Sequence, residues 1–144
     1  MAKVLSINIS DKKGVIKTPI KDGLFIEEHG LKNDAHAGKW HRQVSLLAQE
    51  SIDKMIKMGV NDLDAGKFAE NITTEGIVLH ELPVGTRLKI GETVQEVTQI
   101  GKECHKGCAI KNQVGMCIMP TEGIFTRVIK GGVVREGDSI EILD

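Results

Sequence analysis

Gly85-Thr-Arg-Leu-Lys-Ile90 is the stretch of sequence that decides the fold class. A glycine, polar residues and then apolar residues two positions apart describe a strand that is entered from a tight turn. The same pattern returns near the C-terminus in Gly137-Asp-Ser-Ile-Glu-Ile142. Apolar residues also alternate, less regularly, over residues 3–9 and 93–100. Short alternating segments at intervals along the chain predict a protein that is mostly β.

Helical periodicity is found in two places. Apolar residues recur at helical spacing over residues 48–58, and Gly59 then provides a C-terminal stop, so one helix is predicted there. A second short helix is predicted after Pro120, because the apolar residues of positions 124–129 also recur at helical spacing.

The remaining segments complete the fold prediction. Residues 15–19 and 43–47 are further strand candidates, whereas residues 30–42 have a period of neither 2 nor 3.6 and predict a long ordered loop. Many short strands, sixteen glycines and one or two helices predict an α+β fold built on a mostly antiparallel β-barrel, a class that the family resemblance described below narrows to a mixed β-barrel. No low-complexity linker divides the chain, so we expect a single domain over residues 1–144.

Composition excludes several classes of protein. The net charge of -1 offers no global field for a polyanion, and 3% aromatic residues leave few platforms for base stacking, so no nucleic-acid partner is expected. The sequence contains no apolar run as long as a membrane-spanning helix, which needs about 18 residues or more, and no secretory signal pattern. We therefore expect a cytoplasmic protein without a membrane partner, whose three cysteines stay reduced.

All three cysteines fall between Gly101 and Pro120, in the segment Cys104-His-Lys-Gly-Cys108 and at Cys117. A thiolate attacks sulfur or binds a soft metal, and neighbouring cations such as Lys106 lower the pKa of a thiol. Cys104 and Cys108 are therefore the candidate catalytic and metal-ligating residues.

Two other uses of the cysteines are open at this point. Free cysteine is often buried packing, and this interpretation suits Cys117, which is flanked by apolar residues. Alternatively, the three cysteines and His105 offer four ligands for a structural zinc ion, although the C-x3-C spacing lacks a second closely spaced ligand pair.

A second candidate site is the basic loop, defined here as residues 36–42. Its candidate binding residues are His36, Lys39, His41 and Arg42. Arginine makes bidentate contacts to oxyanions and lysine provides a point charge, so the loop could hold a phosphate or could simply be solvated. Asn71 could likewise be a turn residue or a hydrogen-bonding residue of the site.

Three motifs together resemble the stand-alone MOSC domains, the family named for the C-terminal domain of molybdenum cofactor sulfurases. The first is Asp34-Ala-His36-Ala-Gly38 followed by Val44-Ser-Leu-Leu47, the second is Gly66-Lys-Phe-Ala-Glu70-Asn71-Ile72, and the third is the cysteine segment from Gly101. The family has better-studied enzymes with a C-x-x-C arrangement, so the C-x3-C spacing here leaves open which of Cys104 and Cys108 matches the functional thiol.

The resemblance implies a β-rich barrel and binding of the molybdenum cofactor, a molybdopterin with a dithiolene-bound metal at one end and a phosphate at the other. A thiolate suits the metal end, whereas His36, Lys39, His41, Arg42, Asn71 and Lys106 form the predicted cofactor-binding set. The pyridoxal phosphate-binding part of full sulfurases is not expected in this chain.

The predicted function is sulfur carriage, sulfur transfer or cofactor hand-over through a reactive cysteine, and whether the domain turns over is open. Predicted partners are the molybdenum cofactor, cofactor-biosynthesis proteins and molybdenum enzymes. The alternative is a non-enzymatic module that binds zinc or senses oxidants through its thiols.

Overall fold

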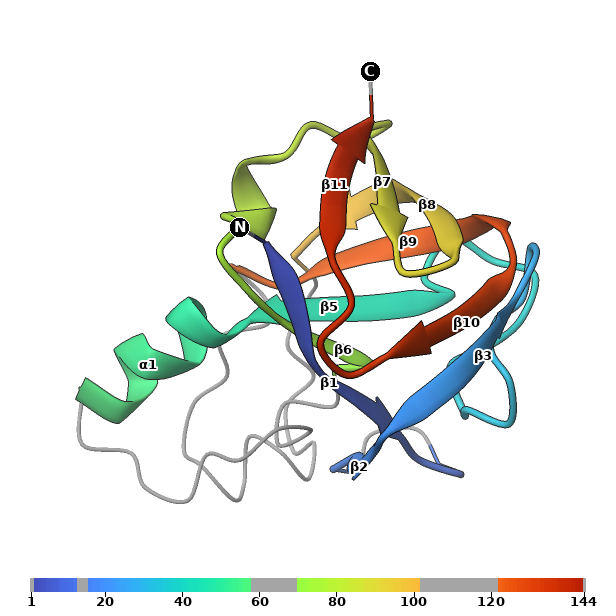
Figure 1. The fold of residues 1–144 in the computed structure, drawn as a ribbon, viewed down its shortest axis with the longest axis horizontal. Helices are drawn as coiled ribbons and strands as arrows, with labels where there is room; N and C mark the ends of the chain where they lie inside the picture. Colours follow the sequence, from blue (N-terminus) through green and yellow to red (C-terminus); the bar gives the residue numbers. More distant parts are fainter. Residues whose placement is uncertain (1, 13–15, 58–69, 102–121, 144) are drawn as a thin grey trace.

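The computed structural model describes residues 2–12, 16–57, 70–101 and 122–143, and the statements below concern these residues. Their main feature is one large, curled sheet of eight strands (Figure 1). Its strands are β1 (Lys3–Ile9), β2 (Thr18–Ile20), β5 (Val44–Ala48), β6 (Ile72–Glu75), β7 (Arg87–Ile90), β8 (Thr93–Ile100), β9 (Ile124–Lys130) and β11 (Ile140–Leu143). A smaller sheet contains β3 (Asp22–Ile26), β4 (Gly30–Leu31) and β10 (Gly132–Arg135).

The large sheet has the strand order β11-β7-β8-β9-β5-β6-β1-β2. Its neighbouring strands are antiparallel except for β5 and β6, which are parallel. A parallel pair needs a crossover connection, and α1 (Gln49–Lys57) follows β5 directly and lies against β5 and β6. The helix buries Ile52 and Met55, so the helical spacing in the sequence marks the face that packs on the sheet. No helix in the described residues is long and apolar enough to cross a membrane.

The two similar stretches of the sequence pair with one another. In β7 and β11, Ile90 lies opposite Ile140 and Leu88 lies opposite Ile142. The structure confirms the strands predicted over residues 3–9, 43–47 and 93–100 and the helix predicted over residues 48–58. The described ends of these elements agree with the prediction to within one or two residues. The mostly β fold with one α-helix is therefore correct.

The second helix that was predicted after Pro120 is wrong over residues 124–129, while residues 120–121 lie outside the described residues. Residues 124–130 form β9, which pairs with both β5 and β8. A strand that is buried on both faces carries a nearly continuous apolar run, and such a run matches helical spacing as well as strand spacing. A short 3-10 helix, η1 (Leu79–Glu81), is present instead between β6 and β7.

The predicted closed barrel is also not found. Among the described strands, β11 and β2 end the sheet and do not pair with one another. The sheet nevertheless curls, because the turn before β11 touches β1: Val4 N–H donates to Asp138 O and Gly137 N–H donates to Val4 O, both at 2.8 Å. This contact forms one isolated bridge, between Lys3 and Ser139, rather than a ladder.

The inner face of the curled sheet carries the main apolar core. Val44, Leu46 and Ala48 of β5 point into it, together with residues of the other strands. Ser45 and Leu47 alternate to the opposite face, yet they are also buried. Both faces of the central strands are thus covered, and the outer face of β1, β5 and β6 carries buried polar side chains, among them Asn8, Ser45 and Thr73.

Candidate functional site

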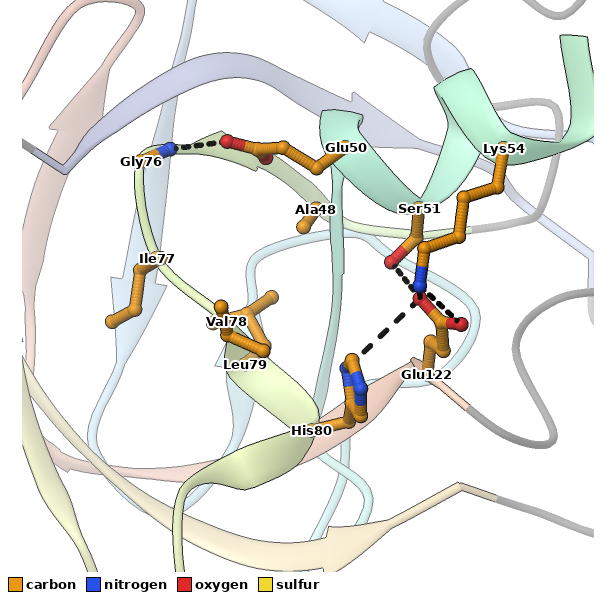
Figure 2. A pocket seen from close by; sticks show the side chains of 10 residues that line it. All are labelled: Ala48, Glu50, Ser51, Lys54, Gly76, Ile77, Val78, Leu79, His80 and Glu122. Atoms are coloured by element: carbon orange, nitrogen blue, oxygen red, sulfur yellow. Dashed lines mark hydrogen bonds and ion pairs between the residues drawn. The ribbon is translucent and has the colours of Figure 1, made fainter. Parts of the chain in front are cut away.

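A cavity of about 230 Å³ lies between α1 and residues 76–80 (Figure 2). Its apolar wall includes Val78 and Leu79, and its polar wall centres on Glu122. The Glu122 carboxylate accepts hydrogen bonds from Ser51 Oγ at 2.6 Å and from Lys54 Nζ at 2.9 and 3.0 Å. Burial alone would raise the pKa of Glu122, but these two donors and the Lys54 charge lower it below its usual value. None of the residues predicted from the sequence lines this cavity.

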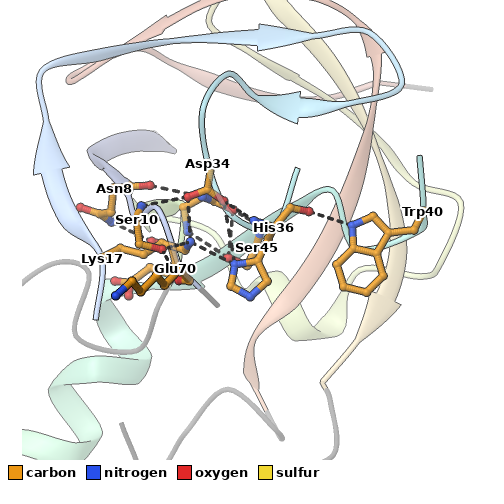
Figure 3. Close-up of polar contacts among 10 residues, drawn as sticks. Asn8, Ser10, Lys17, Asp34, His36, Trp40, Ser45 and Glu70 are labelled. Carbon is orange, nitrogen blue, oxygen red and sulfur yellow. Dashed lines mark hydrogen bonds and ion pairs between the residues drawn. The ribbon is translucent and has the colours of Figure 1, made fainter. Parts of the chain in front are cut away.

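The predicted residues lie instead on the outer face of the sheet, around a buried polar network (Figure 3). Asn71, just before β6, connects β5 to β1. Its side-chain oxygen accepts the Ser45 N–H at 3.0 Å, and its Nδ2 donates to Asn8 O at 3.2 Å. Asn71 is fully buried, so its amide acts as a bridge between strands that are not neighbours.

A second branch of the network runs through Asn8 and Thr73. Asn8 Nδ2 donates to Glu70 O at 3.0 Å and to Thr73 Oγ1 at 3.1 Å, and Thr73 Oγ1 donates to Glu70 Oε2 at 2.8 Å. Ser6 Oγ donates to Asn8 Oδ1 at 2.7 Å. Burying these polar groups away from water costs free energy, and the hydrogen bonds between them offset that cost.

Lys17 joins this region to the motif that begins at Asp34. Its side chain is 1% exposed, and Nζ lies 2.8 Å from Asp34 Oδ1, 2.9 Å from Ser10 Oγ and 3.0 Å from His36 Nδ1. Figure 3 shows the ammonium group among these three side chains, which come from two segments of the chain: Ser10 from one, and Asp34 and His36 from the other.

The Asp34 carboxylate accepts hydrogen bonds from donors on both neighbouring segments of the chain. Besides Lys17, it accepts the Ser10 N–H at 3.0 Å and the His36 N–H at 3.1 Å. Burial alone would raise the pKa of Asp34, but the hydrogen bond and charge of Lys17 outweigh it and leave the pKa below the ordinary value. Asp34 is therefore the anionic centre that orders the start of the loop.

The basic loop is ordered by contacts of its own. Asn33 just before it takes a positive φ of 71°, which asparagine tolerates better than most residues. The Trp40 indole N–H donates to His36 O at 2.7 Å. The ring of Trp40 therefore packs back over the loop instead of extending into solvent.

Arg42 lies between two aromatic rings. Its guanidinium carbon is 5.4 Å from the centroid of Trp40 and 5.7 Å from that of Phe125, within the range of cation–π attraction. Its Nε is buried and has no hydrogen-bond partner among the residues that the structure describes. A buried donor without a partner costs roughly 1–3 kcal/mol, so an acceptor placed there would bind favourably.

The basic loop also contacts the strands that lead into and out of the cysteine segment. His41 Nε2 lies 2.8 Å from Gln99 Oε1, and Gln99 Nε2 donates to Gly101 O at 2.7 Å. Gly101 N–H donates in turn to Gly123 O at 2.7 Å. Gly101 and Gly123, which lie on either side of residues 102–121 in the sequence, are thus adjacent. A series of hydrogen bonds through Gln99 and His41 links them to the basic loop.

The structure gives each predicted residue its own surroundings: His36 contacts Lys17, His41 contacts Gln99, Arg42 lies by Trp40 and Phe125, Asn71 contacts Ser45, and Lys39 is exposed. The predicted residues Cys104, Lys106, Cys108 and Cys117 lie outside the described residues. Within the described ranges no group of His, Cys, Asp or Glu side chains has the arrangement of a metal site, which leaves the predicted cysteine ligands and the zinc alternative untested.

Sequence reasoning missed Lys17, Asn8 and Ser45 as members of this region. A lysine next to a turn is ordinarily a surface residue, and only its proximity to Asp34 makes it a buried one. Asn8 gives a weak signal, since an asparagine at an inward or covered position of an alternating strand requires a partner.

Comparison with known proteins identifies the family. The model of the MOSC domain matches residues 33–141, so the chain belongs to the MOSC domain family, which is linked to the molybdenum cofactor. No curated protein matches the chain as a relative.

Solved structures share the fold. The YUAD protein from Bacillus subtilis is 21% identical, with a TM-score of 0.81 over 98% of this chain and 94% of that one. YiiM from Geobacillus stearothermophilus is 21% identical, with a TM-score of 0.76 over 100% of this chain and 76% of that one. YiiM from Escherichia coli is 17% identical, with a TM-score of 0.70 over 100% and 70%. At these identities the likeness concerns the fold alone.

Proposed function

We propose that this chain binds the molybdenum cofactor on the outer face of the sheet, with the phosphate end at the basic loop and the metal end at the cysteine segment. The observation that carries the proposal is the buried Arg42 Nε, which has no hydrogen-bond partner in the described part of the chain and belongs to a guanidinium held between two rings. It is supported by the hydrogen-bonded path from His41 through Gln99 to Gly101, which connects the basic loop to the start of the cysteine segment.

The residues present fit the phosphate end. Cation–π contacts with Trp40 and Phe125 orient the planar guanidinium of Arg42, so little side-chain freedom remains to be lost when an oxyanion binds. Lys39 is exposed and can add its charge, while the Asp34 carboxylate, just before the loop, forms an ion pair with Lys17. The loop therefore offers cations without an uncompensated anion beside them.

The cysteines supply the proposed role at the metal end. A thiolate suits molybdenum as a soft ligand, and Cys104 or Cys108 would either coordinate the metal or carry a sulfur atom for hand-over to a molybdenum enzyme. When bound, the cofactor supplies the metal and sulfur chemistry. The chain itself binds the phosphate, orients the loop through Asp34 and holds Phe125 and Trp40 around Arg42.

The test is to load the purified protein with cofactor released from a molybdenum enzyme, and to measure bound pterin by fluorescence and bound molybdenum by mass spectrometry. Arg42→Ala removes charge-assisted hydrogen bonds worth about 1.5–3 kcal/mol, so cofactor affinity should fall about 10- to 100-fold. Arg87→Ala is the matched control, because Arg87 is an exposed residue of β7 that pairs with Glu96 outside the loop.

The Cys104→Ala, Cys108→Ala double variant separates the two ends of the site. We expect it to keep pterin through the phosphate end and to retain less molybdenum. Equal molybdenum in wild type and double variant excludes thiolate coordination, and equal affinity in wild type and Arg42→Ala excludes the phosphate site. Stoichiometric zinc that survives dialysis, with no cofactor bound, would favour the zinc alternative instead.

A further inference from the structure

We propose that the cavity between α1 and residues 76–80 binds a small amphipathic cation, whose ammonium group contacts Glu122 and whose apolar body lies against Val78 and Leu79. None of the residues assigned above to the molybdenum cofactor is among the described residues that line this cavity. The inference therefore goes beyond the proposed function, and either one can fail without the other.

The volume of the cavity limits the size of the ligand. An apolar cavity of about 150 Å³ in another protein holds one benzene molecule, which has six carbon atoms. The cavity here measures about 230 Å³, so in proportion it holds a molecule of roughly nine non-hydrogen atoms. This size corresponds to one ring, or one short chain, that carries a single polar group.

The lining has an apolar side and a polar side (Figure 2). The apolar side includes Val78 and Leu79 from the segment after β6, and the polar side includes Ser51, Lys54 and Glu122. Leu79 is fully buried, whereas Val78 is 51% exposed, so the apolar wall extends from the core to the solvent. A ligand with one apolar end and one polar end matches this division.

Glu122 is the polar group that fits a cation. Its side chain is only 15% exposed, and although burial raises its pKa, the hydrogen bonds from Ser51 and Lys54 outweigh this effect, so the carboxylate is ionised at neutral pH. Oε1 accepts from both Ser51 and Lys54, whereas Oε2 accepts only from Lys54 among the described residues. A carboxylate oxygen has two lone pairs, so Oε2 can accept a further donor from the ligand.

The balance of charge in the lining also favours a cation. The described lining has two carboxylates, Glu50 and Glu122, but only one ammonium group, that of Lys54. Glu50 Oε2 accepts the Gly76 N–H at 2.8 Å, which is a neutral donor and leaves the charge of Glu50 in place. A ligand cation reduces this excess of negative charge, whereas a ligand anion adds to it.

Lys54 is the competitor that a cation has to meet at Glu122. Its side chain is 57% exposed, and an ion pair this exposed is weak, because water screens it and the long side chain loses freedom in forming it. The ligand ammonium reaches Glu122 together with an apolar body that leaves water, which Lys54 lacks. Removal of the Lys54 charge should therefore strengthen the binding of a cation and weaken the binding of an anion.

The test is a titration of the nitrogen-labelled protein with phenethylamine, followed through the backbone N–H signals of Gly76 and Leu79 at pH 8, where an ordinary histidine such as His80 would be neutral. We expect saturable shifts of both signals with a Kd of about 1 mM or tighter. The probe 2-phenylethanol has the same size without the charge, and phenylacetate has the opposite charge. The amine should bind about 10-fold more tightly than the alcohol, and phenylacetate should bind most weakly.

Two variants of the cavity separate charge from shape. Glu122→Gln should weaken phenethylamine about 10-fold and leave 2-phenylethanol nearly unchanged. Lys54→Met should strengthen phenethylamine about 2- to 5-fold. Glu92→Gln is the matched control, because Glu92 pairs with Arg135 outside the cavity, and it should leave the binding of all three probes unchanged.

Three results would overturn the proposal. The first is that phenethylamine shifts neither Gly76 nor Leu79, and the second is that 2-phenylethanol binds as tightly as the amine. The third is that phenylacetate binds more tightly than the amine and loses its affinity in Lys54→Met, which would make the cavity an anion site. If Glu122→Gln does not fold, the ranking of the three probes on wild type and on Lys54→Met still decides the sign of the ligand charge.

Discussion

Replacing Lys17 by methionine should destabilise the folded chain strongly. The ammonium is 1% exposed and forms an ion pair with Asp34 in which both side chains are fully buried. The variant leaves the Asp34 carboxylate in the interior with two backbone donors and no cation. Removing one partner of a buried pair costs about 3–5 kcal/mol, a large part of the roughly 5–15 kcal/mol that stabilises a typical domain.

The assay is urea unfolding, followed by circular dichroism and by the fluorescence of Trp40, the one tryptophan of the sequence. Its indole donates to His36 O, so its emission reports on the loop that the ion pair orders. With a denaturant slope of about 2 kcal/mol per molar, a loss of about 4 kcal/mol lowers the midpoint by roughly 2 M.

Lys54→Met is the matched control, since it makes the same substitution in an ion pair whose lysine side chain is 57% exposed. It should cost less than about 1 kcal/mol. Adding Asp34→Asn to Lys17→Met should recover part of the loss, because no unpaired charge then remains buried. The reasoning is refuted if Lys17→Met and Lys54→Met lower the midpoint equally, or if Asp34→Asn adds its full cost to that of Lys17→Met.

Three further predictions concern neighbouring features. The pKa of Asp34 in the folded state lies below its ordinary value of 3.8. The ionised carboxylate therefore contributes its full stabilisation above pH 3.8, and this stabilisation is lost as the pH falls through the folded-state pKa. Acid unfolding of the Asp34→Asn variant should lack this dependence. Gly30→Ala should cost more than Gly85→Ala in thermal unfolding: both have positive φ, at 116° and 98°, but a Cβ on Gly30 would lie 2.6 Å from Gln43 O, whereas nothing lies within 4 Å of Gly85. Asn71→Ala should cost about 1–3 kcal/mol in urea unfolding, because the Ser45 N–H loses its side-chain acceptor; Gln49→Ala, which removes an exposed amide, should be nearly neutral.

Much of the fold could be predicted from local patterns. The alternation in β7 and β11 and the helical spacing in α1 follow from which side of each element is buried, and each pattern is complete within ten or so residues. The prediction of a second helix over residues 124–129 failed because β9 is buried on both faces, so its sequence lacks the alternation that marks a strand. Local patterns could not predict whether the sheet closes into a barrel, because closure depends on how β11 meets β1, and these strands come from opposite ends of the chain.

The candidate site divides in a similar way. The basic loop and the cysteine segment were recognisable because their residue types are chemically distinctive and close together in the sequence. Their adjacency required the register of β8 and β9, which brings Gly101 beside Gly123, and the contact from His41 to Gln99. The orphaned donor of Arg42 is also a tertiary property, since Phe125 approaches it from a distant strand.

The sequence by itself determined the β-rich class, the main helix and the family, because these depend on residue type and short-range order. Only the tertiary structure decided that Lys17 is buried, that it neutralises Asp34 and that it contacts His36. The physical reason is that a buried charge needs its partner. A lysine is tolerated inside only where an anion and further polar groups surround it, and here Ser10 comes from one segment and Asp34 and His36 from another, which meet on folding.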